Sequence, residues 1–143
     1  MKITQISVFL ENKKGRLYDA MRLLGEKGID IKTLSIADNE DFGVLRMIVD
    51  RPEESLELLK ANHFVASLTD IVAVEVGDHP GGLAKVLKVL DENRINIEYM
   101  YAFVEKCADK AILVFRFDDL DKAIAALTKN NIRVVGQKDI VNL

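Results

Sequence analysis

Hydrophobic residues recur along the chain at two kinds of spacing. In some segments they occupy every second position, which is typical of strands, and in others every third or fourth position, which is typical of helices. Residues 3–10 alternate between apolar and polar positions, and residues 71–76 do so as well, which predicts two half-buried strands. Residues 16–27 and 82–93 carry apolar side chains three and four positions apart, which predicts amphipathic helices. Each of these helices therefore follows a strand across a short turn.

The remaining segments fit the same two periods. We expect further strands at 29–37, 44–49, 64–68, 95–104, 111–117 and 132–135, and further helices at 52–62 and from about 118 to 130. Only Thr69 and Asp70 separate two of these strands, so we expect the halves of the chain to be fixed against each other. The segment from Gln137 to Leu143 has no clear pattern.

The second half of the chain repeats the first. Leu17 corresponds to Leu83 at a spacing of 66 residues, and Asp50 corresponds to Asp118 at a spacing of 68. The repeat predicts two domains, residues 1–69 and 70–143, each with the element order βαββαβ. This order is typical of an α+β fold in which an antiparallel four-stranded sheet carries both helices on one face, the ferredoxin-like arrangement.

The turn before the second-half helix is the strongest candidate for chemistry. It reads Gly77-Asp78-His79-Pro80-Gly81-Gly82-Leu83, and its first-half equivalent reads Asn12-Lys13-Lys14-Gly15-Arg16-Leu17. Glycines allow a backbone to approach a ligand closely, and the first N–H groups of a helix have no partner within the helix. Such a turn can hold a small anion such as a carboxylate. A tight turn without a ligand is the alternative that this segment leaves open.

These residues carry a family resemblance. Asp78-x-Pro80-Gly81-x-Leu83 after a strand, with Ile95-Asn96-Ile97 after the helix, resembles the ACT domain, and two copies fill nearly the whole chain. In the first copy Asn12 replaces the aspartate, Lys14 the proline and Arg16 the second glycine. The chain thus resembles a stand-alone tandem ACT protein of the amino-acid-binding, regulatory type.

The resemblance implies a non-catalytic protein that binds a free amino acid between ACT units, where the turn of one unit faces the second strand of the other. It also implies a homodimer and, as a partner, an enzyme of amino-acid metabolism. The expected ligand-binding residues of the second copy are Asp78, His79, Pro80, Gly81, Gly82, Leu83, Asn96, Tyr99 and Met100. Those of the first copy are Asn12, Lys14, Gly15, Arg16, Leu17, Leu34 and Ser35.

Some of these side chains have candidate roles of their own. Asp78 or Asn12 could accept a hydrogen bond from the ammonium group of an amino acid. Tyr99, with Tyr101, either forms a wall for the ligand side chain or packs between the halves. His79 either contacts a ligand or is a solvated loop histidine.

Composition narrows the function classes. The chain has 143 residues, 30% of them charged, and a net charge of −3, which gives no electrostatic reason to expect nucleic acid or a membrane as partner. No apolar run approaches the roughly 20 residues of a membrane span. The strand pattern begins directly after Met1, so we expect no signal peptide, and the single cysteine, Cys107, fits a cytoplasmic protein without an intrachain disulfide. Two histidines and one cysteine far apart predict no metal site, and we expect no cofactor.

Three other functions compete with amino-acid sensing. The chain could be a protein-interaction or oligomerisation module without a ligand. It could be an RNA-binding ferredoxin-like module, for which Phe115 and Phe117 are the strand aromatics that could stack on bases. It could also be a small enzyme, but the carboxylates sit at helix starts and in loops, and we find no catalytic constellation among them.

Overall fold

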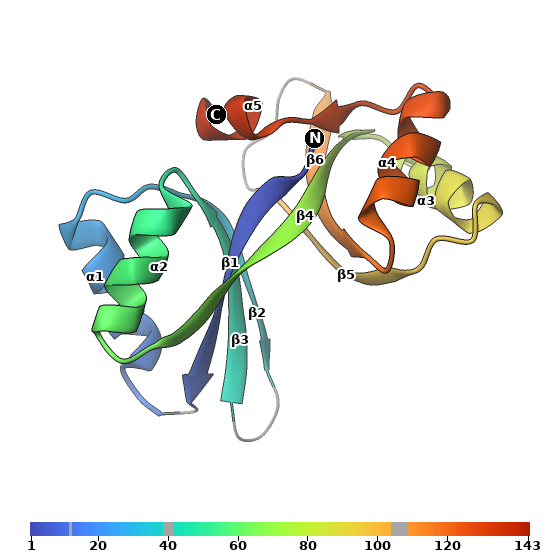
Figure 1. Cartoon of the computed structure of the whole chain (residues 1–143). Coiled ribbons are helices and arrows are strands. Elements are labelled where there is room, and N and C mark those ends of the chain that lie inside the picture. The colour runs from blue at the N-terminus through green and yellow to red at the C-terminus, as the bar shows by residue number, and fades with distance from the viewer. Residues whose placement is uncertain (12, 39–41, 104–108) are drawn as a thin grey trace. The chain divides into compact units, whose positions relative to one another are not determined.

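The computed structural model describes residues 1–143 apart from 12, 39–41 and 104–108 (Figure 1). Its elements follow the order β1 (Ile3–Glu11), α1 (Arg16–Glu26), β2 (Ile31–Asp38), β3 (Phe42–Val49), α2 (Pro52–Ala61), β4 (Val65–Gly77), α3 (Gly82–Glu92), β5 (Ile97–Ala102), β6 (Lys110–Phe117), α4 (Leu120–Lys129), β7 (Val134–Val135) and α5 (Gln137–Val141). The chain divides into two compact units, Thr4–Thr69 and Asp70–Leu143, the second of which also includes Met1–Ile3.

The first unit is a four-stranded sheet with two helices. Its strand order is β2-β3-β1-β4, in which β3 pairs antiparallel with both β1 and β2. Inward-facing residues of the strands pack with α1 and α2 in one buried core, which includes Ile6, Val8, Leu24, Leu45, Met47 and Leu59. Helices α1 and α2 lie side by side on one face of this sheet (Figure 1).

The second unit has the same arrangement. Its strand order is β7-β4-β6-β5, and all three pairings are antiparallel. The core between this sheet and helices α3 and α4 includes Val72, Val74, Leu90, Phe115, Phe117 and Leu127. Both units are therefore βαββαβ ferredoxin-like folds, and the predicted fold class is confirmed.

The backbone repeats as closely as the hydrophobic pattern. Positive φ angles occur in corresponding pairs: Gly15 and Gly81, Gly28 and Arg94, and His63 and Asn131. Both units also share a hydrogen bond that joins the residue before their second strand to the residue after their third strand. The Asp50 carboxylate accepts a hydrogen bond from the Asp30 N–H at 3.0 Å, and the Asp118 carboxylate accepts one from the Asn96 N–H at 3.1 Å.

Several sequence predictions about the strands need correction, including the start of β3 at Phe42 rather than 44 and of β7 at Val134 rather than 132. The strands expected at 64–68 and 71–76 are one continuous strand, β4, because Thr69 and Asp70 both adopt the extended backbone. The strands β2 and β5 begin two residues later than expected, directly after Asp30 and Asn96, whose N–H groups donate to Asp50 and Asp118. The unassigned tail forms the short helix α5, in which Ile140 is fully buried. Cys107 lies outside the described residues.

Candidate functional site

The turn between β4 and α3 brings two backbone segments into close contact. Gly81 caps the helix with a φ of 85°, a left-handed conformation that favours glycine. The next residue, Gly82, is buried, and its N–H donates to the His79 carbonyl at 3.0 Å. A Cβ atom at position 82 would overlap the Gly77 carbonyl oxygen, so this turn requires a glycine there.

The first turn of α3 has hydrogen-bond donors to offer. No side chain caps this helix, and the N–H groups of Leu83 and Ala84 have no acceptor among the described residues. In α4, by contrast, the Asp119 carboxylate accepts from the Lys122 N–H at 3.0 Å. An anion at the start of α3 would therefore meet donors that the protein has not satisfied by itself.

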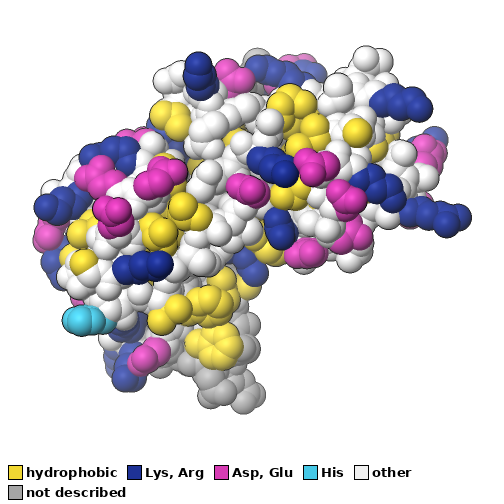
Figure 2. Space-filling model, in the orientation of Figure 1, with side chains coloured by type: hydrophobic (Ala, Val, Ile, Leu, Met, Phe, Trp, Pro, Cys, Tyr) yellow, Lys and Arg dark blue, Asp and Glu magenta, His cyan; other side chains and the backbone are white. Residues whose placement is uncertain are grey.

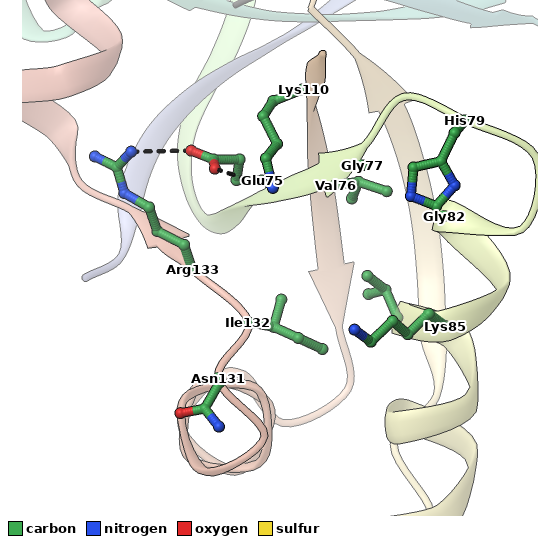
Figure 3. Close-up of a pocket in the computed structure, with 11 residues that line it drawn as sticks. Glu75, Val76, Gly77, His79, Gly82, Lys85, Lys110, Asn131, Ile132 and Arg133 are labelled. Carbon is green, nitrogen blue, oxygen red and sulfur yellow. Dashed lines mark hydrogen bonds and ion pairs between the residues drawn. The ribbon is translucent and has the colours of Figure 1, made fainter. Parts of the chain in front are cut away.

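A cavity of about 200 Å³ lies beside this turn (Figure 3). Four segments form its walls: the end of β4, the first turns of α3, the start of β6 and the connection from α4 to β7. The lining residues are Glu75, Val76, Gly77, His79, Gly82, Lys85, Val86, Lys110, Asn131, Ile132 and Arg133. A protein cavity of about 150 Å³ can hold benzene, so this space suits a ligand of the size of a small amino acid.

Charged side chains gather around Glu75 at one side of the cavity. The Arg133 guanidinium donates to its carboxylate at 2.9 Å, and the Lys110 ammonium lies 4.0 Å from it (Figure 3). The Glu75 side chain is only 21% exposed, so these interactions are partly shielded from water. Lys85 extends from α3 toward Ile132 in Figure 3, and its ammonium has no ion-pair partner among the described residues.

Two neighbours complete the site. The His79 ring packs against Gly77, where an added Cβ atom would lie 2.6 Å from Nε2, and its Nδ1 lies 3.0 Å from the Pro80 carbonyl oxygen. Glu75 and Arg133 also border a second cavity of about 220 Å³, which α5 lines with Asp139. Arg133 reaches Asp139 at 3.5 Å and so links the first cavity to the C-terminal helix.

The equivalent turn of the first unit is built differently. Gly15 caps α1 with a φ of 87°, as Gly81 caps α3. Arg16 stands in the place of Gly82, and its guanidinium carbon lies 4.1 Å from the centre of the Phe64 ring. Phe64 corresponds to Ile132 at the spacing of 68 residues, so Arg16 covers the position that is open beside Gly82. A cation over an aromatic ring typically contributes about 0.5–1 kcal/mol at an exposed site.

The structure unites only some of the predicted site residues. His79 and Gly82 line the cavity, whereas Asp78, Pro80 and Gly81 form the exposed part of the turn and Leu83 packs toward the core. Tyr99 and Met100 lie on β5, opposite Arg116 and Phe115, and are not in the cavity lining. Leu34 and Ser35 lie on β2, Lys14 and Leu17 are exposed, and Asn12 lies outside the described residues.

The predicted site residues do not include nine of the lining residues. These are Glu75, Val76, Gly77, Lys85, Val86, Lys110, Asn131, Ile132 and Arg133. A comparison of the two repeats position by position offers a signal, because Lys85 replaces Asp19 and Arg133 replaces Val65 at the same spacings that revealed the repeat. No three histidine, cysteine, aspartate or glutamate side chains among the described residues could hold a metal ion.

The features suggested for RNA binding are not available in the described structure. Phe115 and Phe117 stack on each other with ring centroids 5.2 Å apart and are fully buried in the second core. On the face drawn in Figure 2, basic and acidic side chains are interspersed rather than gathered into a basic field. A bilayer crossing would need a longer and more apolar helix than any in the described residues.

Comparisons with known proteins agree with this architecture. The sequence matches the family described as "ACT domain pair" over residues 1–143. Protein BT0572 from Bacteroides thetaiotaomicron is 39% identical, with a TM-score of 0.94 over 100% of this chain and 98% of its own. The ligand-free regulatory subunit of aspartate kinase from Thermus thermophilus is 20% identical, with a TM-score of 0.63 over 88% of this chain and 91% of its own. A search of curated proteins found no match.

Proposed function

The chain belongs to the ACT domain pair family, and we propose that it is a non-catalytic regulatory protein that binds a free amino acid at the glycine turn of its second unit. Residues 1–69 and 70–143 are the two ACT domains in this proposal. A protein that shares the fold is the regulatory subunit of aspartate kinase from Thermus thermophilus, which supports a regulatory role here. No catalytic family is indicated by the comparisons.

The observation that carries the proposal is the cavity beside an uncapped helix start. An α-amino acid has a carboxylate and an ammonium group two bonds apart. The N–H groups of Leu83 and Ala84 are donors for the carboxylate, and the half-buried Glu75 carboxylate is an acceptor for the ammonium. Val86 and Ile132 offer apolar surface to the remainder of the ligand.

The expected affinity suits a metabolite sensor. A charge-assisted hydrogen bond contributes on the order of 1.5–3 kcal/mol. A ligand of about ten heavy atoms that gains ~0.8 kcal/mol per atom would bind with a Kd near 1 μM. Binding of this strength responds to changes in a free amino-acid pool.

We assign the ligand to the second unit alone. Gly82 lines the cavity there, whereas Arg16 lies over Phe64 at the equivalent place in the first unit. One bound amino acid per chain is the expected stoichiometry.

Regulation requires that the ligand bind one state of the protein better than another. We propose that binding changes the packing within a homodimer of this chain in the cytoplasm, and that an enzyme of amino-acid metabolism responds to the change. The ligand sites that the family resemblance suggests at Asn96, Tyr99, Met100, Leu34 and Ser35 belong to this proposal as contacts across such packing.

A thermal-shift screen of all twenty amino acids tests the binding proposal. The paired variants are Gly81→Val and Gly15→Val, which alter two helix caps with nearly the same φ, 85° and 87°. Both should lower the melting temperature, because a β-branched residue is strained there. Only Gly81→Val should abolish the ligand-induced rise in melting temperature. If no amino acid raises the melting temperature at millimolar concentration, the proposal is wrong.

A protein-interaction role is the second candidate. The ring centroids of Phe9 and Phe42 lie 6.3 Å apart on the first unit, and the two side chains are 46% and 43% exposed, so they form a small exposed apolar pair. Replacement of both by serine should lower the association state in light scattering if these rings form a contact. An unchanged mass would remove this support for the second candidate.

A further inference from the structure

Comparison of the two units shows which residues the fold requires and which charged residues of the cavity it does not require. The two units share the left-handed glycine that caps the helix, yet four charged lining residues of the second unit have different equivalents in the first. Glu75, Lys85, Lys110 and Arg133 correspond to Phe9, Asp19, Phe42 and Val65. The strand pairing supports this correspondence, since Gly77 lies opposite Lys110 and Glu11 lies opposite Phe42. The fold forms without these charges, so their presence in one unit points to another role.

Lys85 stands at a position that does not favour a cation. It lies in the first turns of α3, close to the positive end of the helix dipole, where acidic residues are stabilising. The equivalent residue of α1 is Asp19, which has the favourable charge. Lys85 is exposed, so water can solvate its ammonium, and an anion in the cavity beside it would offset the unfavourable position.

The remaining charges leave the cavity positive. Among the described lining residues Glu75 is the one carboxylate, and Arg133 pairs both with it and with Asp139 at 3.5 Å, while Lys110 lies 4.0 Å from Glu75. Three cations thus face two carboxylates, and Lys85 is the cation that has no acidic partner among the described residues. The α-carboxylate and α-ammonium of a bound amino acid cancel each other's charge. A ligand whose side chain carries a second carboxylate would therefore match the cavity better than a neutral or basic one.

We propose that the cavity of the second unit selects an acidic amino acid, and that Lys85 binds its side-chain carboxylate. This inference rests on the proposed function and adds the class of ligand to it. Lys110 and Arg133 hold Glu75 ready for the α-ammonium and add to the positive field.

Titration calorimetry of the full chain tests the selection. The probes are glutamate and aspartate, each against its own amide, glutamine or asparagine, which has nearly the same shape without the charge. At least one acid should bind ten times more tightly than its amide. That preference should weaken as salt is raised from low to physiological concentration, because the cavity is open to solvent.

Two lysines of α3 give a matched pair of variants. Lys85→Met should reduce the acid-to-amide preference at least tenfold, and Lys85→Arg should retain most of it. Lys88→Met is the control, because Lys88 is absent from the cavity lining, is 75% exposed and pairs with Glu92 at 3.8 Å. It removes one positive charge from the same helix and should leave the preference unchanged.

The outcomes separate this inference from the proposed function. Tight binding of a neutral or basic amino acid, with no preference for an acid over its amide, would overturn the inference and leave amino-acid sensing intact. Retained preference in Lys85→Met, or equal loss in Lys88→Met, would overturn the role of Lys85. Succinate and glutarate lack the amine, and their binding as tightly as the amino acids would overturn the proposed function while retaining the charge selection. Binding of no amino acid and no dicarboxylate would overturn both.

Discussion

The close approach of Gly82 to Gly77 predicts opposite effects for the same substitution in two helices. A Cβ atom on Gly82 would overlap the Gly77 carbonyl oxygen, which is backbone and cannot rotate away as a side chain could. Gly25 lies within α1, and an added Cβ there meets no atom within 4 Å. Gly82→Ala should therefore destabilise the protein, and Gly25→Ala should stabilise it.

The magnitudes follow from steric overlap and helix propensity. Alanine is favoured over glycine in a helix by about 0.5–1 kcal/mol, which sets the expected gain for Gly25→Ala. At position 82 the same gain is opposed by overpacking, which typically costs 1–3 kcal/mol and should fall at the upper end against rigid backbone. The expected net loss for Gly82→Ala is about 1–2 kcal/mol.

Urea unfolding of both variants beside the parent chain measures these changes. Each kcal/mol corresponds to a shift in the melting temperature of about 4 °C for a chain of this length. Gly82→Ala should also lose the response to the ligand, because the start of α3 must move away from the strand. If Gly82→Ala is as stabilising as Gly25→Ala, the two backbone segments do not approach as the structure has them, and the argument for the cavity fails with it.

Three further predictions concern the helix starts and one exposed ion pair. Gly15→Ala and Gly81→Ala should each lower the free energy of unfolding by about 1–2 kcal/mol in urea titrations, because both residues have left-handed backbones. Asp119→Ala should cost about 1 kcal/mol in the same assay, because its carboxylate caps α4. The Glu11 carboxylate accepts a hydrogen bond from Lys13, which lowers its pKa, and NMR titration should find that pKa raised again in Lys13→Met. Any stability from this pair is present above the unfolded-state pKa and is lost as the pH falls through the lowered one.

Most of the fold could be predicted because periodicity and repeat agree. The two halves have the same pattern of apolar positions. Because Leu17 corresponds to Leu83, each element predicted in one half supports the same element in the other half. The continuous strand β4 was missed because Thr69 and Asp70 are polar and suggest a turn by themselves. Whether a strand continues through polar residues depends on its pairing with neighbouring strands, and the local sequence pattern does not show that pairing.

The sequence predicts the glycine turn of the candidate site but not the charged residues around Glu75. The glycines of the turn carry a local signal, since they permit the left-handed cap and the close contact at Gly82. Lys110 and Arg133 have no local sequence signal. They come close to Glu75 only because β6 pairs with β4 in this register and because the connection before β7 passes beside β4. Residues that strand pairing brings together from distant segments have no common motif. Comparison of the two repeats can mark Arg133 as different from Val65, but only the structure shows that it meets Glu75.

The difference between the two turns explains why the proposed ligand site is assigned to one unit. Both keep the left-handed glycine at the helix cap, so that residue serves the turn itself. The next residue differs: Arg16 covers Phe64, whereas Gly82 leaves the surface beside Ile132 open. An arginine in the second unit would clash with the Gly77 carbonyl, and a glycine in the first would uncover an aromatic ring. The residues beside the helix cap therefore differ between the units, and a fold that tolerates both versions does not require the cavity for stability.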